Sequence, residues 1–247
     1  MTLPTISIII PVYNEERRCA ASLRKLAGFA QESGYISEII FVDDGSVDRT
    51  AVLIEDFQKQ CGKMRLIRHD GNKGKGAAVR TGMRDALITG TADFLLFTDI
   101  DLSTPLEETI RLTLIAKEKK AGLIIGSRSM PESVVTTLPP LNRRIISKIF
   151  NTARRCIILP DIHDSQCGFK LFSRSAAEII FLRQKIDGFA FDVEIITIAQ
   201  IHNIIVKEVG VIWNYEVGGN LKIIPTSLRM IRDIISVRMN VFFGKYK

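Results

Sequence analysis

The chain has 247 residues, of which 46% are hydrophobic and 25% charged, and its formal net charge is +7. This length suits one large α/β domain with a substantial core, and a chain of this size does not need disulfides to hold its fold. The basic excess indicates an anionic partner, which charge alone leaves open among nucleotide phosphate, nucleic acid and an acidic membrane surface.

Cysteine spacing and hydropathy indicate in which cellular compartment the protein is expected to lie. The four cysteines are widely spaced without a C-x-x-C pair, so we expect reduced thiols in a cytosolic protein. The residues after Met1 lead directly into a strand without a basic and apolar leader, so no secretory signal is expected. Apolar stretches fall short of the roughly 18 residues of a spanning helix, so at most the protein is expected to lie on a membrane.

The first third of the chain repeats a unit of strand, polar loop and helix. Apolar, β-branched runs predict the strands, and spacings of three and four residues predict the helices. The expected strands cover 6–12, 39–42 and 65–68, and the helices that follow them cover 17–30, 48–57 and 77–89. Because polar residues follow each strand at the same end, the pattern predicts a parallel, nucleotide-binding sheet.

The loop over residues 69–76 is rich in glycine and lysine. Glycines let backbone N–H groups approach a phosphate, while lysines and the next helix N-terminus supply positive charge. The loop matches neither the P-loop nor the dinucleotide-binding pattern, so an NTPase or a Rossmann dehydrogenase is not supported. On composition alone, a tight surface turn with solvated lysines stays open.

Two carboxylates end the apolar run that begins at Leu95. Alternation along an extended chain places Asp99 and Asp101 on one side, at the carboxyl end of a buried parallel strand. Both side chains can then bind one hard cation, Mg²⁺ or Mn²⁺, which could hold a substrate diphosphate. In the alternative, Asp99 caps a turn and Asp101 is solvated.

The second half of the chain is less regular. We expect helices over 106–120, 142–159, 174–182 and 195–202, and strands over 121–126 and 206–215. The Pro-, Thr- and Ser-containing stretch 130–141 is a candidate lid beside the ligand crevice. Residues 161–172 place acid, amide and lysine side chains together, and 188–194 place two more acids before a helix.

Residues 226–243 predict a helix with one broad apolar face and basic flanks. A helix built in this way can lie in an anionic membrane interface, with Arg and Lys reaching toward lipid headgroups. From periodicity alone, a terminal helix packed on the domain's own sheet is an equal alternative.

Seven short motifs occur in the order found in one enzyme family. With them the sequence resembles the inverting family 2 glycosyltransferases of the GT-A fold, and within these the dolichyl-phosphate glucosyl- and mannosyltransferases. The resemblance covers almost the whole chain and implies a catalytic domain over 1–222, followed by the amphipathic helix of 223–247. The motifs are Pro11–Glu15, Val42–Ser46, Asn72–Gly76, Asp99–Asp101, Gly126–Arg128, Asp164–Lys170 and Phe191–Glu194.

The resemblance implies residues for the sugar-nucleotide donor. The first loop and Asp43 are expected to hold the nucleoside, Lys73 to meet the diphosphate, and Asp99 with Asp101 to bind the metal. Ser103 stands where mannosyl enzymes often carry Gln, so no third metal ligand is expected there. The implied donor residues are Pro11, Tyr13, Glu15, Asp43, Asp44, Gly45, Lys73, Gly76, Asp99 and Gln166.

The resemblance also implies an acceptor side. Ser127, Arg128, Arg143 and Arg144 match the region used around the acceptor phosphate in polyprenyl-phosphate enzymes. Asp101, Arg128 and Asp192 are the implied catalytic residues. Gln166, Lys170, Asp192 and Glu194 fall in motifs that line the sugar and acceptor side.

The expected activity is inverting transfer of a hexose from a nucleotide sugar to a polyprenyl (dolichyl) phosphate, with Mg²⁺ or Mn²⁺ as cofactor. The segments around residues 101–105 and 211–222 look more like the glucosyl than the mannosyl branch of the family, and this resemblance implies glucose from UDP-glucose rather than mannose from GDP-mannose. A phosphate acceptor needs no strong base, whereas a hydroxyl acceptor would need a carboxylate base, with Asp192 or Asp164 as candidates.

The alternatives are a transferase with a soluble or polysaccharide acceptor and, less favoured, a non-catalytic sugar-nucleotide module. A nucleic-acid partner is not expected, because aromatic side chains make up only 7% of the chain and do not alternate with its basic residues. We expect a peripheral protein on the cytoplasmic face of a membrane. The oligomeric state is left open.

Overall fold

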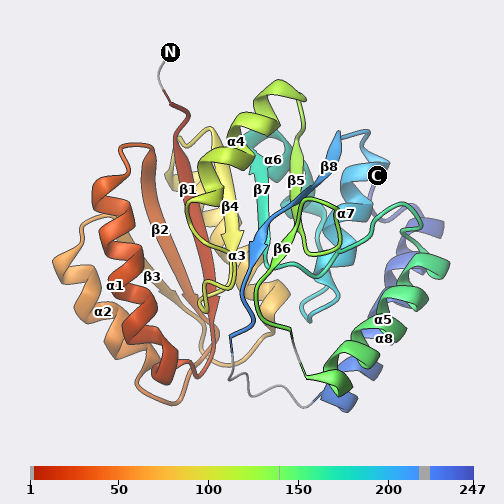
Figure 1. Cartoon of the computed structure of the whole chain (residues 1–247), viewed down its shortest axis with the longest axis horizontal. Coiled ribbons are helices and arrows are strands. Elements are labelled where there is room, and N and C mark those ends of the chain that lie inside the picture. Colours follow the sequence, from red (N-terminus) through yellow and green to blue (C-terminus); the bar gives the residue numbers. More distant parts are fainter. Residues whose placement is uncertain (1–2, 139, 217–222) are drawn as a thin grey trace.

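The computed structural model of the chain describes residues 3–138, 140–216 and 223–247. The side chains of residues 142, 143, 145, 146, 149 and 223–227 lie outside this description. The described part has three layers, with helices on both faces of a central sheet (Figure 1). The predicted α/β class with a mostly parallel sheet is confirmed.

Within the described residues, the central sheet has seven strands in the order β3-β2-β1-β4-β7-β5-β8. Strand β7 runs antiparallel to both of its neighbours, β4 and β5, and the other pairings are parallel. The strands are β1 (Ile6–Val12), β2 (Ile36–Asp43), β3 (Met64–Arg68), β4 (Phe94–Thr98), β5 (Leu123–Ser127), β7 (Phe169–Ser173) and β8 (Val206–Gly210). A separate parallel pair joins β6 (Val134–Val135) to β9 (Ile212–Trp213).

Alternating side chains of the strands pack against different helix layers. Along β1, Ile8 and Ile10 belong to one core cluster and Ile9 belongs to the other. The layer on the Ile8 side consists of α1 (Glu16–Glu32), α2 (Thr50–Gln60) and α4 (Glu108–Glu118). The layer on the Ile9 side consists of α3 (Lys75–Thr89), α6 (Arg174–Arg183) and α7 (Phe191–Ile201). Both faces of the sheet are therefore covered, which explains the near-continuous apolar runs of its parallel strands.

Two parts of the sheet differ from the prediction. The stretch 161–172, predicted only to place acid, amide and lysine side chains together, ends in most of strand β7, which the sequence analysis missed. Its apolar pattern is interrupted because Lys170, the second residue of the strand, is fully buried. The single strand predicted over 206–215 is interrupted at Val211, so that β9 leaves the main sheet and pairs with β6.

Helices α5 (Leu141–Ile157) and α8 (Ile223–Phe242) pack against each other beside the second layer (Figure 1). Ile234, Val237 and Tyr246 belong to the same core cluster as the side chains of α3 and α7. The last helix thus packs on the domain, as one of the two predicted alternatives requires. The boundary proposed between residues 222 and 223 lies partly outside the described residues. No helix in the described ranges is long and apolar enough to span a membrane.

Candidate active site at the carboxyl end of β4

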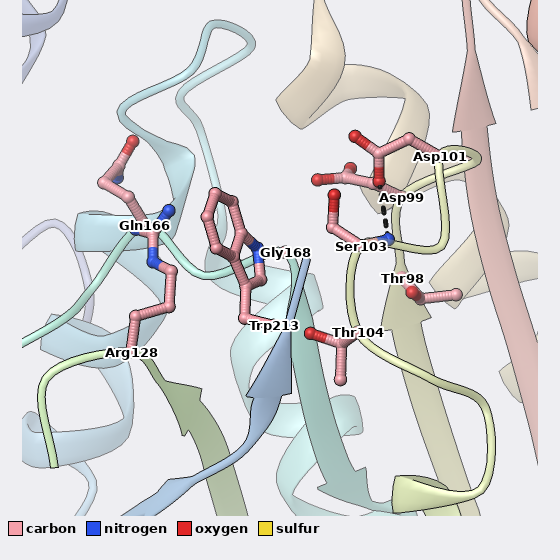
Figure 2. A pocket seen from close by; sticks show the side chains of 9 residues that line it. All are labelled: Thr98, Asp99, Asp101, Ser103, Thr104, Arg128, Gln166, Gly168 and Trp213. Carbon is pink, nitrogen blue, oxygen red and sulfur yellow. Dashed lines mark hydrogen bonds between the residues drawn. The ribbon is translucent and has the colours of Figure 1, made fainter. Parts of the chain in front are cut away.

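A small pocket lies where the carboxyl ends of the central strands meet (Figure 2). Its volume is about 90 Å³, less than a whole nucleotide sugar needs, so it can hold only part of such a ligand. Its lining residues are Thr98, Asp99, Asp101, Ser103, Thr104, Arg128, Gln166, Gly168 and Trp213. Segments far apart in the sequence therefore contribute to one site.

Asp99 and Asp101 both line this pocket. Strand β4 ends at Thr98, so the prediction that an extended chain aligns the two carboxylates is wrong. A turn brings them together instead, in which Leu102 has φ 50° and the Ser103 N–H donates to Asp101 at 3.0 Å (Figure 2). Burial raises the pKa of Asp101, and the negative charge of Asp99 adds to this effect.

Gly168 lies directly against the Asp99 carboxylate. A Cβ built on this glycine would collide with Oδ2 and Cγ of the Asp99 carboxylate. Gly168 directly precedes β7, so the antiparallel strand that the sequence analysis missed also shapes the acidic site. Any side chain at this position would have to displace the Asp99 carboxylate, so the glycine lets the carboxylate take its present place.

Lys75 is the cation nearest to Asp99 among the described contacts, with 2.7 Å between Lys75 Nζ and Asp99 Oδ1. Burial is the largest effect and disfavours the Lys75 ammonium, but the charges of Asp99, Asp192 and Asp101 together outweigh it and raise the pKa of Lys75. The side chain of Lys73, the predicted diphosphate ligand, is exposed, so Lys75 rather than Lys73 is brought to the acids. Sequence reasoning missed Lys75 because it started α3 at Ala77, whereas the helix begins at Lys75.

Asp44 organises the loop that carries these lysines. Its buried carboxylate accepts hydrogen bonds from the backbone N–H groups of Lys73 and Gly74, at 2.9 and 2.8 Å, and contacts His69 Nδ1 at 2.7 Å. His69 Nε2 lies 3.0 Å from the hydroxyl of Thr81. Two of the N–H groups expected to cradle phosphate are therefore bound within the protein, and Asp44 shapes the loop.

The predicted nucleoside residues lie at the ends of β1 and β2. Tyr13 is 44% exposed, and Asp43 is fully buried, with 3.1 Å between Asp43 Oδ2 and the Arg68 Nε. Glu15 forms an ion pair with Arg18 at 2.7 Å, and Arg18 reaches to 3.7 Å from Asp101. The first loop thus connects to the acidic site through Arg18. The last three predicted donor residues here are Pro11 in β1, Gly45 after β2 and Gly76 in α3.

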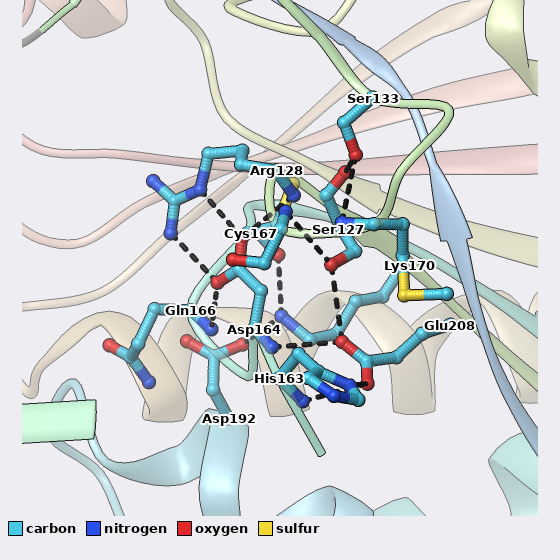
Figure 3. Close-up of polar contacts among 12 residues, drawn as sticks. Ser127, Arg128, Ser133, His163, Asp164, Gln166, Cys167, Lys170, Asp192 and Glu208 are labelled. Atoms are coloured by element: carbon cyan, nitrogen blue, oxygen red, sulfur yellow. Dashed lines mark hydrogen bonds and ion pairs between the residues drawn. The ribbon is translucent and has the colours of Figure 1, made fainter. Parts of the chain in front are cut away.

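Arg128 is held by two hydrogen bonds to one carboxylate (Figure 3). Its Nε and Nη2 donate to Asp164 at 2.7 and 2.8 Å, and its guanidinium lies 5.2 Å from the centre of the Trp213 ring. Burial opposes ionisation of Asp164, but the charge and hydrogen bonds of Arg128, with the charge of Lys170, together outweigh burial and hold the pKa of this carboxyl at about 2. No described residue accepts a hydrogen bond from Arg128 Nη1, so this edge can meet an anion.

Glu208 binds the backbone next to this pair (Figure 3). Its carboxylate accepts hydrogen bonds from the backbone N–H groups of His163 and Asp164, at 2.7 and 2.8 Å, and from the Ser127 hydroxyl at 3.2 Å. Ser127 is therefore buried and engaged within the protein rather than facing an acceptor. Sequence reasoning missed Glu208 because it lies in a strand remote from every motif.

Asp192 and Lys170 form a buried ion pair with 2.5 Å between Asp192 Oδ1 and Lys170 Nζ (Figure 3). Lys170 also donates to the carbonyl of Cys167 at 2.6 Å. Burial raises the pKa of Asp192, and the Lys170 ammonium opposes this. Asp192 lies outside the pocket lining, and its carboxylate is engaged by Lys170.

The remaining predicted residues lie in different places. Gln166 lines the pocket, and its buried Nε2 has no hydrogen-bond partner among the described residues. Glu194 accepts backbone hydrogen bonds from residues 185 and 186 and lies outside the pocket lining. Arg144 is exposed on α5, and the structure does not bring it into the pocket; the side chain of Arg143 lies outside the described part.

The two pocket carboxylates fit a divalent cation. They are hard oxygen donors, and the mutual repulsion that helps to raise the pKa of Asp101 would be relieved by a cation between them. Among the described residues no cluster of three or more metal-ligating side chains occurs, so a bound ion would take its other ligands from substrate oxygens and water.

Comparisons with known proteins agree with this geometry. The profile of glycosyl transferase family 2 matches residues 7–181. The chain is 33% identical to the dolichyl-phosphate β-glucosyltransferase of Dictyostelium discoideum, over 98% of this chain and 76% of that protein. Its identity to the enzymes of the same name is 31% for Saccharomyces cerevisiae, over 98% of this chain and 76% of the other, and 28% for Homo sapiens, over 100% and 81%.

Solved structures with the same fold include a glucosyl-3-phosphoglycerate synthase from Mycobacterium tuberculosis. Its complex with Mn²⁺, UDP and glucosyl-3-phosphoglycerate superposes with a TM-score of 0.67 at 16% identity, covering 95% of this chain and 80% of that one. Its complex with Mn²⁺ and UDP-glucose gives a TM-score of 0.66, also at 16% identity, over 95% and 79%. At this identity the likeness concerns the fold.

Proposed function

The chain belongs to glycosyl transferase family 2, and from this premise we propose that it transfers glucose from UDP-glucose to a polyprenyl (dolichyl) phosphate with inversion at the anomeric carbon. The enzyme class follows from the family. The donor and acceptor are supported by the relatives named dolichyl-phosphate β-glucosyltransferase and by the chemistry of the pocket.

The donor would lie with its diphosphate at Asp99 and Asp101. A bound Mg²⁺ or Mn²⁺ would supply positive charge to the leaving nucleoside diphosphate. Lys75, already 2.7 Å from Asp99, adds a second positive charge on the same side. Stabilising the charge that develops on the leaving group is the main catalytic contribution we assign to these residues. Tyr13, Glu15 and the loops at the ends of β1 and β2 would hold the nucleoside.

Our choice of a phosphate over a hydroxyl acceptor rests on how the two candidate bases, Asp164 and Asp192, are bound within the protein. Asp164 has a pKa of about 2 because Arg128 binds it, so it is a poor proton acceptor. The Asp192 carboxylate is engaged by the Lys170 ammonium at 2.5 Å and lies outside the pocket lining, so it is not placed to take a proton from an acceptor there, although burial raises its pKa. An acceptor that is already ionised needs no base, and the Nη1 edge of Arg128 would orient a phosphate beside the donor. These contacts favour a phosphate over a hydroxyl acceptor.

The outward face of α8 suits a lipid acceptor. Its exposed apolar side chains are spaced so that they share one side of the helix, and exposed basic side chains flank them. The apolar set is Leu228, Ile235, Met239 and Phe242, with Phe243 following, and the basic set is Arg229, Arg232, Arg238 and Lys245. We assign this face to an anionic membrane surface, with the protein peripheral on the cytoplasmic side, where its free cysteines stay reduced.

The test compares acceptors and donors in detergent with Mn²⁺. Labelled UDP-glucose is offered with a short polyprenyl phosphate or with the polyprenol of the same length, and labelled GDP-mannose is offered in parallel. Label in the lipid phosphate from UDP-glucose alone is expected. Transfer to the polyprenol would contradict the argument that no carboxylate base is available for a hydroxyl acceptor. Label from GDP-mannose would show that the donor is GDP-mannose and not UDP-glucose.

A flotation assay tests the membrane face. The double variant Leu228→Ser with Phe242→Ser should lose binding to vesicles containing anionic lipid. Ile88→Ser serves as the matched control, because Ile88 is 83% exposed on α3 and is no part of this face. Equal flotation of both variants would place the membrane contact elsewhere.

A further inference from the structure

Residues 184–189, between α6 and α7, touch both the C-terminal helix and the start of α3. We propose that Tyr246 is a positioning residue for the donor. Through Glu194 and the 184–189 segment, it holds the start of α3 where Lys75 reaches Asp99. The inference rests on the proposed function only in assigning Lys75 to the donor diphosphate.

Tyr246 is inserted into the domain core, where its side chain is 1% exposed. Its hydroxyl donates to Glu194 Oε1 at 2.6 Å and accepts from Asn240 Nδ2 at 3.1 Å. Its backbone carbonyl accepts a hydrogen bond from His202 Nε2 at 2.7 Å. The ring and both polar groups are thus fixed, so the direction of the hydroxyl is set by the fold.

Glu194, in the first turn of α7, connects Tyr246 to the 184–189 segment through hydrogen bonds. The same Oε1 accepts the Lys185 N–H at 3.0 Å, and Oε2 accepts the Ile186 N–H at 2.8 Å. Burial raises the pKa of Glu194, and the hydrogen bond from Tyr246 opposes this. A buried carboxylate needs all of its donors, so loss of the tyrosine hydroxyl weakens its hold on both backbone N–H groups.

The 184–189 segment in turn lies against the first residues of α3. Gln184 Nε2 donates to the Gly76 carbonyl at 2.9 Å, and the Ala77 N–H donates to the Asp187 carbonyl at 3.2 Å. The approach is so close that a Cβ on Gly76 would lie 2.5 Å from the Ile186 carbonyl oxygen. A shift of this segment therefore has to move the start of α3.

Lys75 lies within this packed contact. Its ammonium is 5.9 Å from the ring centre of Phe189, at the end of the 184–189 segment, and 2.7 Å from Asp99. Helix α8 also approaches the segment directly, since a Cβ on Gly188 would lie 3.1 Å from Asp233 Oδ2. The seating of α8 and Tyr246 is thus coupled by direct contacts to the lysine at the acidic site.

A purely structural role for Tyr246 makes a different prediction. It would lower the stability of the chain but leave the folded protein with unchanged affinity for nucleotide. A positioning role changes affinity while the protein remains folded. The distinguishing probe is UDP with Mn²⁺, measured by calorimetry well below the melting temperature, because it reports the donor side without requiring transfer.

The test uses Tyr246→Phe in the full chain, which keeps the ring and removes the hydroxyl. We expect UDP to bind at least about five-fold more weakly, and amide hydrogen exchange to become faster in residues 184–189 and 74–77. Tyr35→Phe is the matched control, because Tyr35 packs on Phe29 of α1 on the opposite side of the sheet. The control should bind UDP as the wild type does.

A second variant tests the same hydrogen bond from the side of Glu194, so that the conclusion does not depend on one substitution. Glu194→Gln should weaken UDP binding in the same way, and the double variant should be no weaker than the worse single variant, because both act through one contact. UDP affinity within two-fold of wild type in Tyr246→Phe, an equal loss in Tyr35→Phe, or additive losses would overturn the inference. Wild-type protein that binds UDP but transfers no glucose would overturn the proposed function alone, whereas absence of UDP binding would overturn both.

Discussion

Replacing Asp164 by Asn tests whether the buried pair with Arg128 is required both for the fold and for the acceptor site. The substitution preserves the shape of the side chain and removes the charge that Arg128 binds at 2.7 and 2.8 Å. Both the free energy of unfolding and the use of lipid phosphate should change, because the variant leaves the guanidinium without its counter-charge.

The size of the stability effect follows from the pKa of Asp164. A shift from 3.8 in the unfolded chain to about 2 in the folded protein corresponds to about 2.5 kcal/mol of stability at neutral pH. Because the folded pKa is lowered, this contribution is present above pH 4 and is lost as the pH falls toward 2. At pH 3 roughly half of it should remain.

The assay is denaturant unfolding of the wild type and Asp164→Asn, followed by circular dichroism at pH 7 and pH 3. We expect the variant to be less stable by about 2.5 kcal/mol at pH 7 and by about half of that at pH 3. Asp161→Asn, an exposed acid in the same segment, should change little. An equal difference at both pH values, or none at pH 7, would refute the electrostatic account of the pair.

In the transfer assay Asp164→Asn should raise KM for polyprenyl phosphate by about ten-fold, the size expected for a weakened phosphate contact. An unchanged KM would mean that Arg128 does not orient the acceptor. Lys75→Met should raise KM for UDP-glucose by more than ten-fold, whereas Lys73→Met, at an exposed side chain, should have a smaller effect; the reverse order would restore Lys73 as the diphosphate ligand. Gly168→Ala should displace the Asp99 carboxylate and weaken Mn²⁺ binding, measured by calorimetry in the presence of UDP, with circular dichroism confirming the fold.

The repeating units of strand and helix could be read from the sequence because each strand is an apolar run followed by polar residues. Strand β7 could not, since the buried Lys170 interrupts its apolar pattern and finds its partner, Asp192, 22 residues further along the chain. The alternation argument placed Asp99 and Asp101 side by side, as they lie in the pocket, but for the wrong reason, because a turn rather than a strand positions them.

Within the site, motifs identified residues but not their partners. Asp164 and Arg128 each lie in a motif, yet only the fold shows that they bind each other. Lys75 was overlooked because one helix boundary was placed two residues too late. Glu208 and Tyr246 act through hydrogen bonds to distant segments, at separations of 44 and 52 residues, and local sequence carries no signal for such contacts.

The most direct test of metal-dependent, inverting glucosyl transfer to a lipid phosphate is the anomeric configuration of its product. Wild-type protein is incubated with ¹³C-labelled UDP-glucose, Mn²⁺ and a short polyprenyl phosphate, and the lipid fraction is examined by NMR. The account predicts a β-linked glucosyl phosphate that forms only when the metal is present. An α-linked product, a product formed equally well after removal of divalent cations, or labelled glucose found only in the aqueous phase would contradict it.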